Sequence, residues 1–217
     1  MMRPRRRAAV EVVVAPNVAR GVGPVDDLPH EDRSRASALT DPLDRERFYA
    51  GRQLLRAVLA ERIGRGPREL RIGSGVHGRP FLLDDGPSVA VACGRDWCAV
   101  ALSDDCAVGV ALGERGQEPS MPLIAGRLPE SARRDVLAAP PEQRATVAVR
   151  CWATLEAAVV ACGATLDRAA ECLPLVAGEV RQPAEDVIVA VAGRTARTLE
   201  ARWSVRGGAT SLPVPAA

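Results

Sequence analysis

The sequence contains six cysteines and two histidines, residue types that often act as nucleophile and general base in enzymes. No two cysteines are spaced as Cys-x-x-Cys, and this argues against a zinc site. Cys93 comes two residues before Arg95, whose positive charge could lower the pKa of a thiol and make it a nucleophile. His77 would then be the general base, because His30 falls in a polar loop. The alternative interpretation is that Cys93 is an unreactive thiol that fills space in the core.

Arginine supplies every basic side chain of the lysine and arginine kind. The sequence contains 29 of these residues, and all of them are arginine. Arginine stays protonated in proteins, so none of them can serve as a general base. This usage is typical of a GC-rich, bacterial genome. The formal net charge is only +2, so we expect no bulk attraction to nucleic acid or to a membrane surface.

The cysteines, at positions 93, 98, 106, 151, 162 and 172, fall within apolar runs. This placement is typical of small buried thiols in the reducing cytoplasm. We expect no membrane-spanning segment, because no stretch is long and apolar enough. Basic residues 3–7 followed by residues 8–15 superficially resemble a signal peptide, but Glu11 interrupts the apolar run and Pro16 ends it. The first apolar run is therefore interpreted as a strand of a cytoplasmic protein.

Hydrophobic periodicity divides the chain into two parts, each with a long helix and several strands. Asp41 and Pro42 are a start signal for a helix that continues to Ile63, after a loop at 16–41. A second long helix is predicted to end at Gly163. The predicted elements besides the first long helix are helices at 129–138 and 142–162 and strands at 9–14, 70–72, 80–83, 89–93, 97–102, 108–112, 187–191 and 198–205. Helices and antiparallel strands in separate segments favour an α+β fold.

Four segments between residues 45 and 166 together resemble the 4′-phosphopantetheinyl transferases of the surfactin-synthetase-activating type. Residues 45–56 resemble the first long helix of that family, and His77-Gly78-Arg79-Pro80 resembles its G-[KR]-P turn. The other two segments resemble the stretch from F-N-x-S-H-S to G-[VI]-D-[IV]-E and the W-x-x-K-E-A-x-x-K-x-x-G helix; they are residues 89–112 and 152–163. The resemblance implies a monomer of two similar α/β halves related by a pseudo-twofold axis, each with a long helix packed on a small antiparallel sheet. The halves would be residues 1–112 and 113–217, with a cofactor cleft between them.

The resemblance also implies a cofactor and a partner. The family transfers the phosphopantetheine arm of coenzyme A to a serine of an acyl or peptidyl carrier protein, and it uses Mg²⁺ to neutralise the phosphates. Arg47, Arg52 and Arg79 stand where the family contacts coenzyme A, and all three keep a positive charge. Glu156 matches the glutamate of the last motif, and it is the metal ligand that the match implies.

Most of the other family positions that carry the chemistry have changed. Cys93 stands where the family has histidine. Ala111 and Gly113 replace two metal-binding carboxylates, and Leu155 and Val160 replace two lysines. The match therefore implies a scaffold without the base and without most of the metal site.

Three hypotheses for the function follow. The first is a pseudoenzyme that binds coenzyme A, an acyl carrier protein or both in polyketide, nonribosomal peptide or fatty-acid metabolism, without efficient transferase activity. The second is a divergent holo-[acyl-carrier-protein] synthase that holds Mg²⁺ with Glu156 and bound phosphates, or with Glu114 if a bulge turns that side chain. The third is an acyl-transferring or cyclising enzyme in which Cys93 acts on a carrier-bound thioester.

Overall fold

A run of valines builds the first strand and places it at the centre of the molecule. β1 (Ala8–Pro16) has Val10, Val12 and Val14 on one face and Val13 on the other, and all four are buried. Both faces of β1 are packed against other elements, which accounts for its high valine content. The structure, a computed structural model, describes residues 7–17 and 28–206 of the chain.

β1 lies inside a four-stranded sheet whose order is β4-β5-β1-β9. The other strands are β4 (Ser88–Cys93), β5 (Trp97–Ser103) and β9 (Leu199–Val205). β1 and β5 are antiparallel, as are β4 and β5, whereas β1 and β9 are parallel. The last described strand of the chain therefore lies beside the first.

A second sheet has the order β6-β8-β7, and α5 (Pro141–Cys162) lies across it. Its antiparallel strands are β6 (Ala107–Glu114), β7 (Ala177–Ala184) and β8 (Val187–Arg194). Small residues let α5 lie close to the second sheet. A β-carbon on Gly109 of β6 would overlap the main chain of α5 at Ala157 and Ala161. Alanines from α5, β6 and β8 form the rest of this contact.

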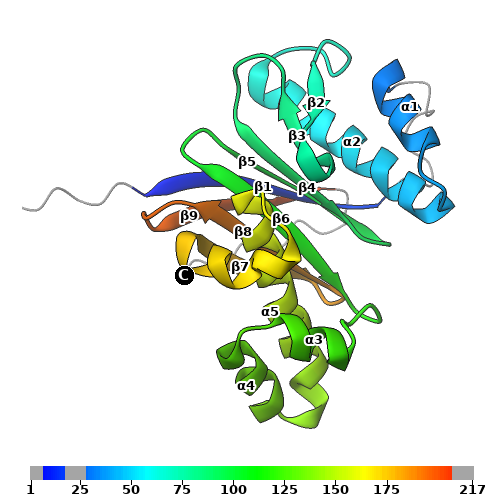
Figure 1. Cartoon of the computed structure of the whole chain (residues 1–217). Helices are drawn as coiled ribbons and strands as arrows, with labels where there is room; N and C mark the ends of the chain where they lie inside the picture. Colours follow the sequence, from blue (N-terminus) through cyan, green and yellow to red (C-terminus); the bar gives the residue numbers. More distant parts are fainter. Residues whose placement is uncertain (1–6, 18–27, 207–217) are drawn as a thin grey trace, which may run out of the picture.

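The two sheets pack face to face, and one long helix covers each outer face (Figure 1). Valines of β1 and alanines of β4 and β5 contact valines of β6 and β8 in the middle layer of the core. Leucines of α2 (Pro42–Ile63) pack on the opposite face of the first sheet. The molecule thus has the layer order α2, first sheet, second sheet, α5. The mixture of helices with mainly antiparallel sheets agrees with the predicted α+β class.

Local signals explain the ends of α2. The Asp41 side chain accepts a hydrogen bond from the backbone N–H of Leu43 at 2.8 Å, and Pro42 occupies the first turn. Gly64 ends the helix with a φ of 73°, a conformation that glycine adopts without steric cost. The remaining elements are α1 (His30–Ser37), β2 (Ile72–Ser74), β3 (Pro80–Leu82), α3 (Met121–Arg127), α4 (Glu130–Ala138), α6 (Ala169–Cys172) and three short 3₁₀ turns, Val76–Gly78, Leu166–Arg168 and Leu173–Leu175.

The structure differs from the sequence-based prediction in several places. The predicted loop at 16–41 contains α1, so His30 begins a helix, and residues 18–27 of that loop lie outside the described residues. α3, α6 and β7 were not expected. The predicted boundary between residues 112 and 113 falls inside β6, all of which pairs with β8. β9, from residues 113–217, belongs to the first sheet, and most of β6, from residues 1–112, belongs to the second. Each expected half therefore contributes a strand to the sheet of the other.

α5 is long and apolar enough by composition to cross a membrane, and it is the one helix with this property in the described part of the chain. Its apolar face packs on β6 and β8, where Ala153, Ala157 and Ala161 are buried. This contact is that of a core helix.

Candidate functional site

Two adjoining cavities form a cleft beside the outer strands β4 and β6. The first has a volume of about 400 Å³ and is lined by α2, by β4 and by the turn that contains Gly78 and Pro80. The second has a volume of about 420 Å³ and is lined mainly by β4, β6 and α5. Arg47, Val91 and Cys93 line both, so the cavities meet at these residues. The cleft therefore lies between the two long helices.

A cluster of three buried charges lies beside the first cavity. Asp32, Arg52 and Arg56 are 2%, 4% and 4% exposed, respectively. The Asp32 carboxylate accepts from Nε and Nη2 of Arg56 at 3.0 and 2.8 Å, and it lies 3.4 Å from Nε of Arg52. Nη2 of Arg52 donates to the Ser74 hydroxyl at 2.6 Å, and the guanidinium lies over the Phe48 ring, 5.2 Å from its centroid, but Nη1 has no hydrogen-bond partner among the described residues. Two guanidinium groups thus share one carboxylate.

This arrangement leaves Arg52 with an unfavourable electrostatic environment. Burial lowers the pKa of its guanidinium, Asp32 raises it in part, and Arg35 and Arg56 lower it further. Arginine remains protonated, so the site holds excess positive charge where water is largely excluded. Arg47 adds a second cation to the cleft: its Nη1 is 3.3 Å from Asp44, and its buried Nε has no partner within the described ranges. An anion bound in the first cavity would offset this charge.

Arg79 makes structural contacts with the second sheet and with the helix that covers it. Its Nη1 donates to the carbonyl of Val160 in α5, and its Nη2 donates to the carbonyl of Val108 in β6, both at 2.8 Å. Burial lowers the pKa of this guanidinium. Arg79 therefore connects the Gly-Arg-Pro turn to β6 and α5, whereas Arg47 and Arg52 line the cleft.

Glu156 reaches the second cavity from α5. Burial raises the pKa of its carboxyl, and a hydrogen bond from Trp152 opposes this effect in part. The described residues contain no group of three histidine, cysteine, aspartate or glutamate side chains that could hold a metal ion. Ala111 is buried against α5, and a β-carbon on Gly113 would overlap Val149 of α5. Ala111 also lines the second cavity but has no oxygen that could bind a metal ion, whereas a side chain at position 113 would meet α5.

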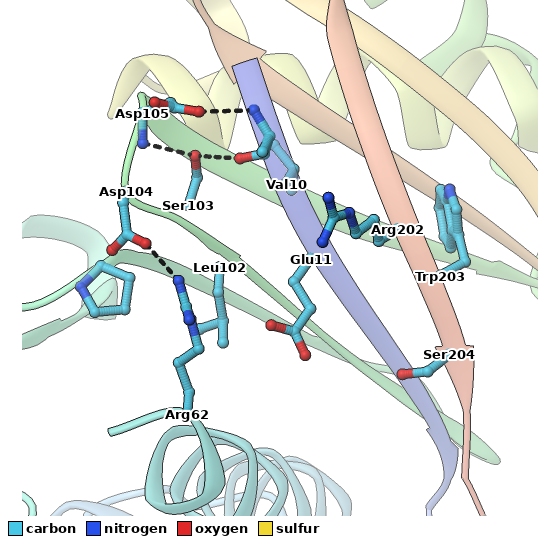
Figure 2. Close-up of a pocket in the computed structure, with 12 residues that line it drawn as sticks. Val10, Glu11, Arg62, Leu102, Ser103, Asp104, Asp105, Arg202, Trp203 and Ser204 are labelled. Carbon is cyan, nitrogen blue, oxygen red and sulfur yellow. Dashed lines mark hydrogen bonds and ion pairs between the residues drawn. The ribbon is translucent and has the colours of Figure 1, made fainter. Parts of the chain in front are cut away.

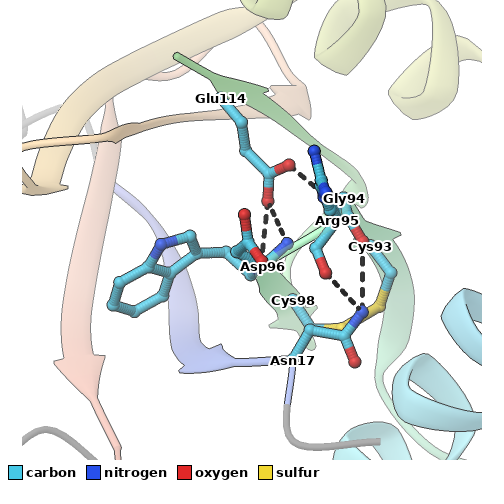
Figure 3. The surroundings of a disulfide bond; sticks show 8 residues. Asn17, Cys93, Gly94, Arg95, Asp96, Cys98 and Glu114 are labelled. Carbon is cyan, nitrogen blue, oxygen red and sulfur yellow. Dashed lines mark hydrogen bonds between the residues drawn. A yellow bond between two sulfur atoms is a disulfide. The ribbon is translucent and has the colours of Figure 1, made fainter. Parts of the chain in front are cut away.

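Glu114 holds a turn together and does not face a metal site. Its carboxylate is buried and accepts hydrogen bonds from three consecutive backbone N–H groups, those of residues 95–97, at 2.7, 3.0 and 2.8 Å (Figure 3). The Gln117 side chain donates a fourth at 3.0 Å. These contacts use both oxygens, so Glu114 is not positioned to replace the lost carboxylates.

Cys93 and Cys98 form a disulfide across β4 and β5 (Figure 3). They are directly opposite in the ladder, with Cα atoms 4.2 Å apart. The expectation of six free thiols is therefore wrong for this pair, because the turn places them side by side; Cys106, Cys151, Cys162 and Cys172 are free. The nucleophilic thiolate of the third hypothesis would first require reduction of this bond.

His77 was the proposed imidazole partner of that thiolate. It adopts a left-handed backbone conformation with a φ of 58°, and its side chain is exposed. The first cavity is lined instead by its neighbours Gly78 and Pro80. The structure thus brings Arg47, Arg52, Cys93 and Glu156 to one cleft and leaves His77 on a surface turn.

No family model and no curated protein matches this chain. The resemblance to phosphopantetheinyl transferases stays a prediction from the four sequence segments. The chemistry of the cleft is therefore inferred from its own residues.

Asp32 is the functional residue that sequence reasoning missed. It lies in α1, in the segment predicted as a loop, and it contacts α2 across the helix pair. Pro29 followed by Glu31 and Asp32 is a helix start signal, with acidic residues in the first turn. Its pairing with Arg52 and Arg56 depends on how α1 packs on α2, which the sequence pattern does not contain.

A third cavity, of about 410 Å³, lies away from the cleft, between α2 and the strands β1 and β9 (Figure 2). Several of its polar groups are used in structural contacts. Arg62 pairs with Asp104 at 2.6 Å, Asp105 accepts from the N–H of Ala9 at 2.9 Å, and the Ser103 hydroxyl donates to the carbonyl of Ala9 at 2.7 Å. These contacts hold the β5–β6 turn against β1 and α2.

Proposed function

We propose that this protein is a phosphopantetheinyl-transferase-like protein that binds coenzyme A and lacks efficient transferase activity. The observation that carries the proposal is the excess positive charge at Arg52. Two buried guanidinium groups share the carboxylate of Asp32, and Nη1 of Arg52 has no hydrogen-bond partner within the described part of the chain. A phosphate group would supply both a negative charge and hydrogen-bond acceptors.

The rest of the cleft suits the other parts of coenzyme A. Arg47 lines both cavities and can contact a second phosphate between them. Val91, Val110, Leu112 and Val159 give the second cavity an apolar wall, along which a pantetheine arm can lie. Each cavity falls within the range of about 300–1,000 Å³ that is usual for small-molecule sites.

The same cleft supports the loss of efficient transfer. Phosphopantetheinyl transfer needs a metal to neutralise the phosphates and a base for the serine hydroxyl. Glu156 is the carboxylate that lines the second cavity; Ala111 also lines it but has no oxygen that could bind a metal ion, and Gly113 packs against α5. By the family resemblance, we also propose an acyl or peptidyl carrier protein as partner, a role in polyketide, nonribosomal peptide or fatty-acid metabolism, and a monomer in the cytoplasm.

Isothermal titration calorimetry with coenzyme A tests the proposal. We expect binding that is weakened about tenfold by Arg52→Gln and by Arg47→Gln, since a lost charge-assisted hydrogen bond costs about 1.5 kcal/mol or more. Arg134→Gln is the matched control, because Arg134 lies on α4 with its side chain 73% exposed. Binding that is absent, or that responds equally to all three substitutions, would contradict the proposal.

Mg²⁺ distinguishes the proposal from a divergent holo-[acyl-carrier-protein] synthase. Glu156 supports that second candidate, because a carboxylate in the second cavity could share a metal ion with bound phosphates. Coenzyme A binding that is unchanged by Mg²⁺ favours the non-transferase function. Binding that Mg²⁺ strengthens, together with modification of a carrier protein that is lost in Glu156→Gln, favours the synthase.

A further inference from the structure

The Cys93–Cys98 disulfide presents one of its two sulfurs to the cleft. Cys93 lines both cavities, whereas Cys98 is 2% exposed on the adjoining strand. β4 is the outer strand of its sheet, so Cys93 lies at an edge that a ligand can approach. Thiol–disulfide exchange depends on which sulfur the attacking thiolate can reach. Attack from the cleft therefore falls on Cys93, with Cys98 as the leaving group.

The surroundings of Cys93 carry excess positive charge. Arg47 lines the same two cavities. Arg52, which shares the Asp32 carboxylate with Arg56, lines the first cavity. Two carboxylates also line these cavities. Asp44 is 3.3 Å from Nη1 of Arg47, and burial raises the pKa of the Glu156 carboxyl. Cationic groups both attract an anionic ligand and stabilise a thiolate.

We infer that the Cys93–Cys98 disulfide undergoes thiol–disulfide exchange with a phosphate-bearing thiol of the coenzyme A type held in the cleft. The choice of ligand rests on the proposed function, but the exchange reaction is an additional activity. The phosphates bind at Arg47 and Arg52, and the thiol reaches Cys93 at the junction of the two cavities. The cleft thus joins a site for the charged end of such a ligand to a sulfur that its other end can attack.

The reaction balances without a further oxidant. The ligand thiolate attacks Sγ of Cys93, a mixed disulfide forms, the Cys93–Cys98 bond breaks, and the electron pair leaves on Sγ of Cys98, which takes a proton. A second ligand thiolate then attacks the ligand sulfur of the mixed disulfide and releases Cys93 as a thiolate. Two thiols are oxidised to one ligand disulfide, and one protein disulfide is reduced to two thiols.

Other cysteines are poorer candidates for this exchange. Cys172 is buried, and burial and the neighbouring Cys162 raise its pKa to about 11. Burial also raises the pKa of Cys151. Cys106 lies near Ser103 at the far end of β5, so it provides an internal control.

A pair of single-cysteine variants tests the site of exchange. Cys98→Ser leaves a free thiol at Cys93, so coenzyme A disulfide should transfer one coenzyme A to it, and no resolving thiol remains. We expect mass spectrometry to find one adduct on Cys93 in this variant and none in Cys93→Ser. Adduct formation that is equal in the two variants, or that occurs at Cys106, overturns the inference. Circular dichroism confirms that each variant is folded.

The charge requirement is tested with an uncharged reagent. In Cys98→Ser we expect coenzyme A disulfide to react at least about tenfold faster than hydroxyethyl disulfide, since a charged cleft raises encounter rates by about that factor or more. Arg52→Gln should remove most of this ratio, because it removes a charge that attracts the phosphates. Equal rates for the two reagents overturn the inference.

Wild-type protein provides a test that does not depend on the cysteine variants. Coenzyme A should reduce the native disulfide faster than 2-mercaptoethanol at equal thiolate concentration, as followed by the appearance of two protein thiols. Calorimetry with desulfo-coenzyme A separates this inference from the proposed function. Binding of this thiol-free analogue without preferential reduction by coenzyme A overturns the exchange alone. Failure of the analogue to bind overturns the proposed function as well.

Discussion

The carboxylate of Glu114 occupies the space that a β-carbon on Gly94 would need. It accepts hydrogen bonds from the backbone N–H groups of residues 95–97, so the end of β6 holds the turn that joins β4 to β5. The same turn places Cys93 opposite Cys98 at the cleft. The stability of the turn therefore bears directly on the site.

Removal of the Glu114 carboxylate should destabilise the protein. Glu114→Ala leaves three backbone N–H groups of the turn without their acceptor, and we expect a loss of about 3 kcal/mol in the free energy of unfolding. Urea denaturation measures this loss. Glu130→Ala is the control, because Glu130 is exposed on α4 and should change the value by about 0.5 kcal/mol or less. Equal effects of the two substitutions would mean that the turn does not depend on Glu114.

Substitution of Asp32 should lower the free energy of unfolding more than substitution of Arg52. Asp32→Asn removes the one carboxylate that the two buried guanidinium groups share, so we expect a loss of about 3 kcal/mol or more. Arg52→Met leaves Asp32 paired with Arg56 and should cost only about 1 kcal/mol. Thermal and urea unfolding of both variants checks the order. A larger loss for Arg52→Met would show that the site does not carry excess positive charge.

The long helices could be predicted from the sequence because their signals are local. The first was expected from Pro42 to Ile63 and has those bounds, since its cap and its apolar spacing lie within the segment. α1 was missed because its apolar periodicity is weak and its buried Asp32 pairs with residues of α2. The helix start signal at residues 29–32 is local, but the contacts that hold Asp32 against α2 are with residues 20 and 24 positions away.

The site was predictable only in part for a related reason. Arg47 and Arg52 were predicted as cofactor contacts from the family resemblance, and both line the first cavity. Arg79 has the same charge, yet the fold turns it toward carbonyls of β6 and α5. The disulfide had a signal that was not used. A four-residue turn between two strands sets residues 93 and 98 opposite each other.

The buried carboxyl of Glu156 should make stability depend on pH. Its pKa is raised in the folded state from an ordinary value of about 4.5, so the protonated form is favoured by folding. The group therefore contributes stability that is present below about pH 4.5 and is lost as the pH rises through the folded pKa. The Glu156→Gln variant does not undergo this loss of stability. The free energy of unfolding of the variant relative to wild type should therefore increase from pH 4 to pH 7.

Urea denaturation across that pH range measures the Glu156 effect. Glu185→Gln is the control, because Glu185 and its partner Arg115 are both exposed and such pairs contribute little. A difference between Glu156→Gln and wild type that stays constant with pH would show that the carboxyl is not buried enough to shift its pKa.

Gly51 lets α2 approach β4 at the disulfide. Replacement of a helix glycine by alanine usually stabilises a protein, but at this position we expect it to destabilise the protein. A β-carbon there would lie 2.9 Å from Cγ1 of Val91 and 3.0 Å from Sγ of Cys93. Alanine favours a helix over glycine by about 1 kcal/mol, but overpacking of this kind costs about 1–3 kcal/mol. We expect Gly51→Ala to lower the free energy of unfolding by about 1 kcal/mol.

Two comparisons separate the steric effect from helix propensity. Gly126 lies in α3, and a β-carbon there would have no atom of the described residues within 4 Å, so Gly126→Ala should stabilise the protein. In a Cys93→Ala, Cys98→Ala background the sulfur is gone, and Gly51→Ala should cost less than in wild type. Chemical denaturation of this double-mutant cycle gives the coupling between positions 51 and 93. A coupling of zero would place the two residues farther apart than the structure has them.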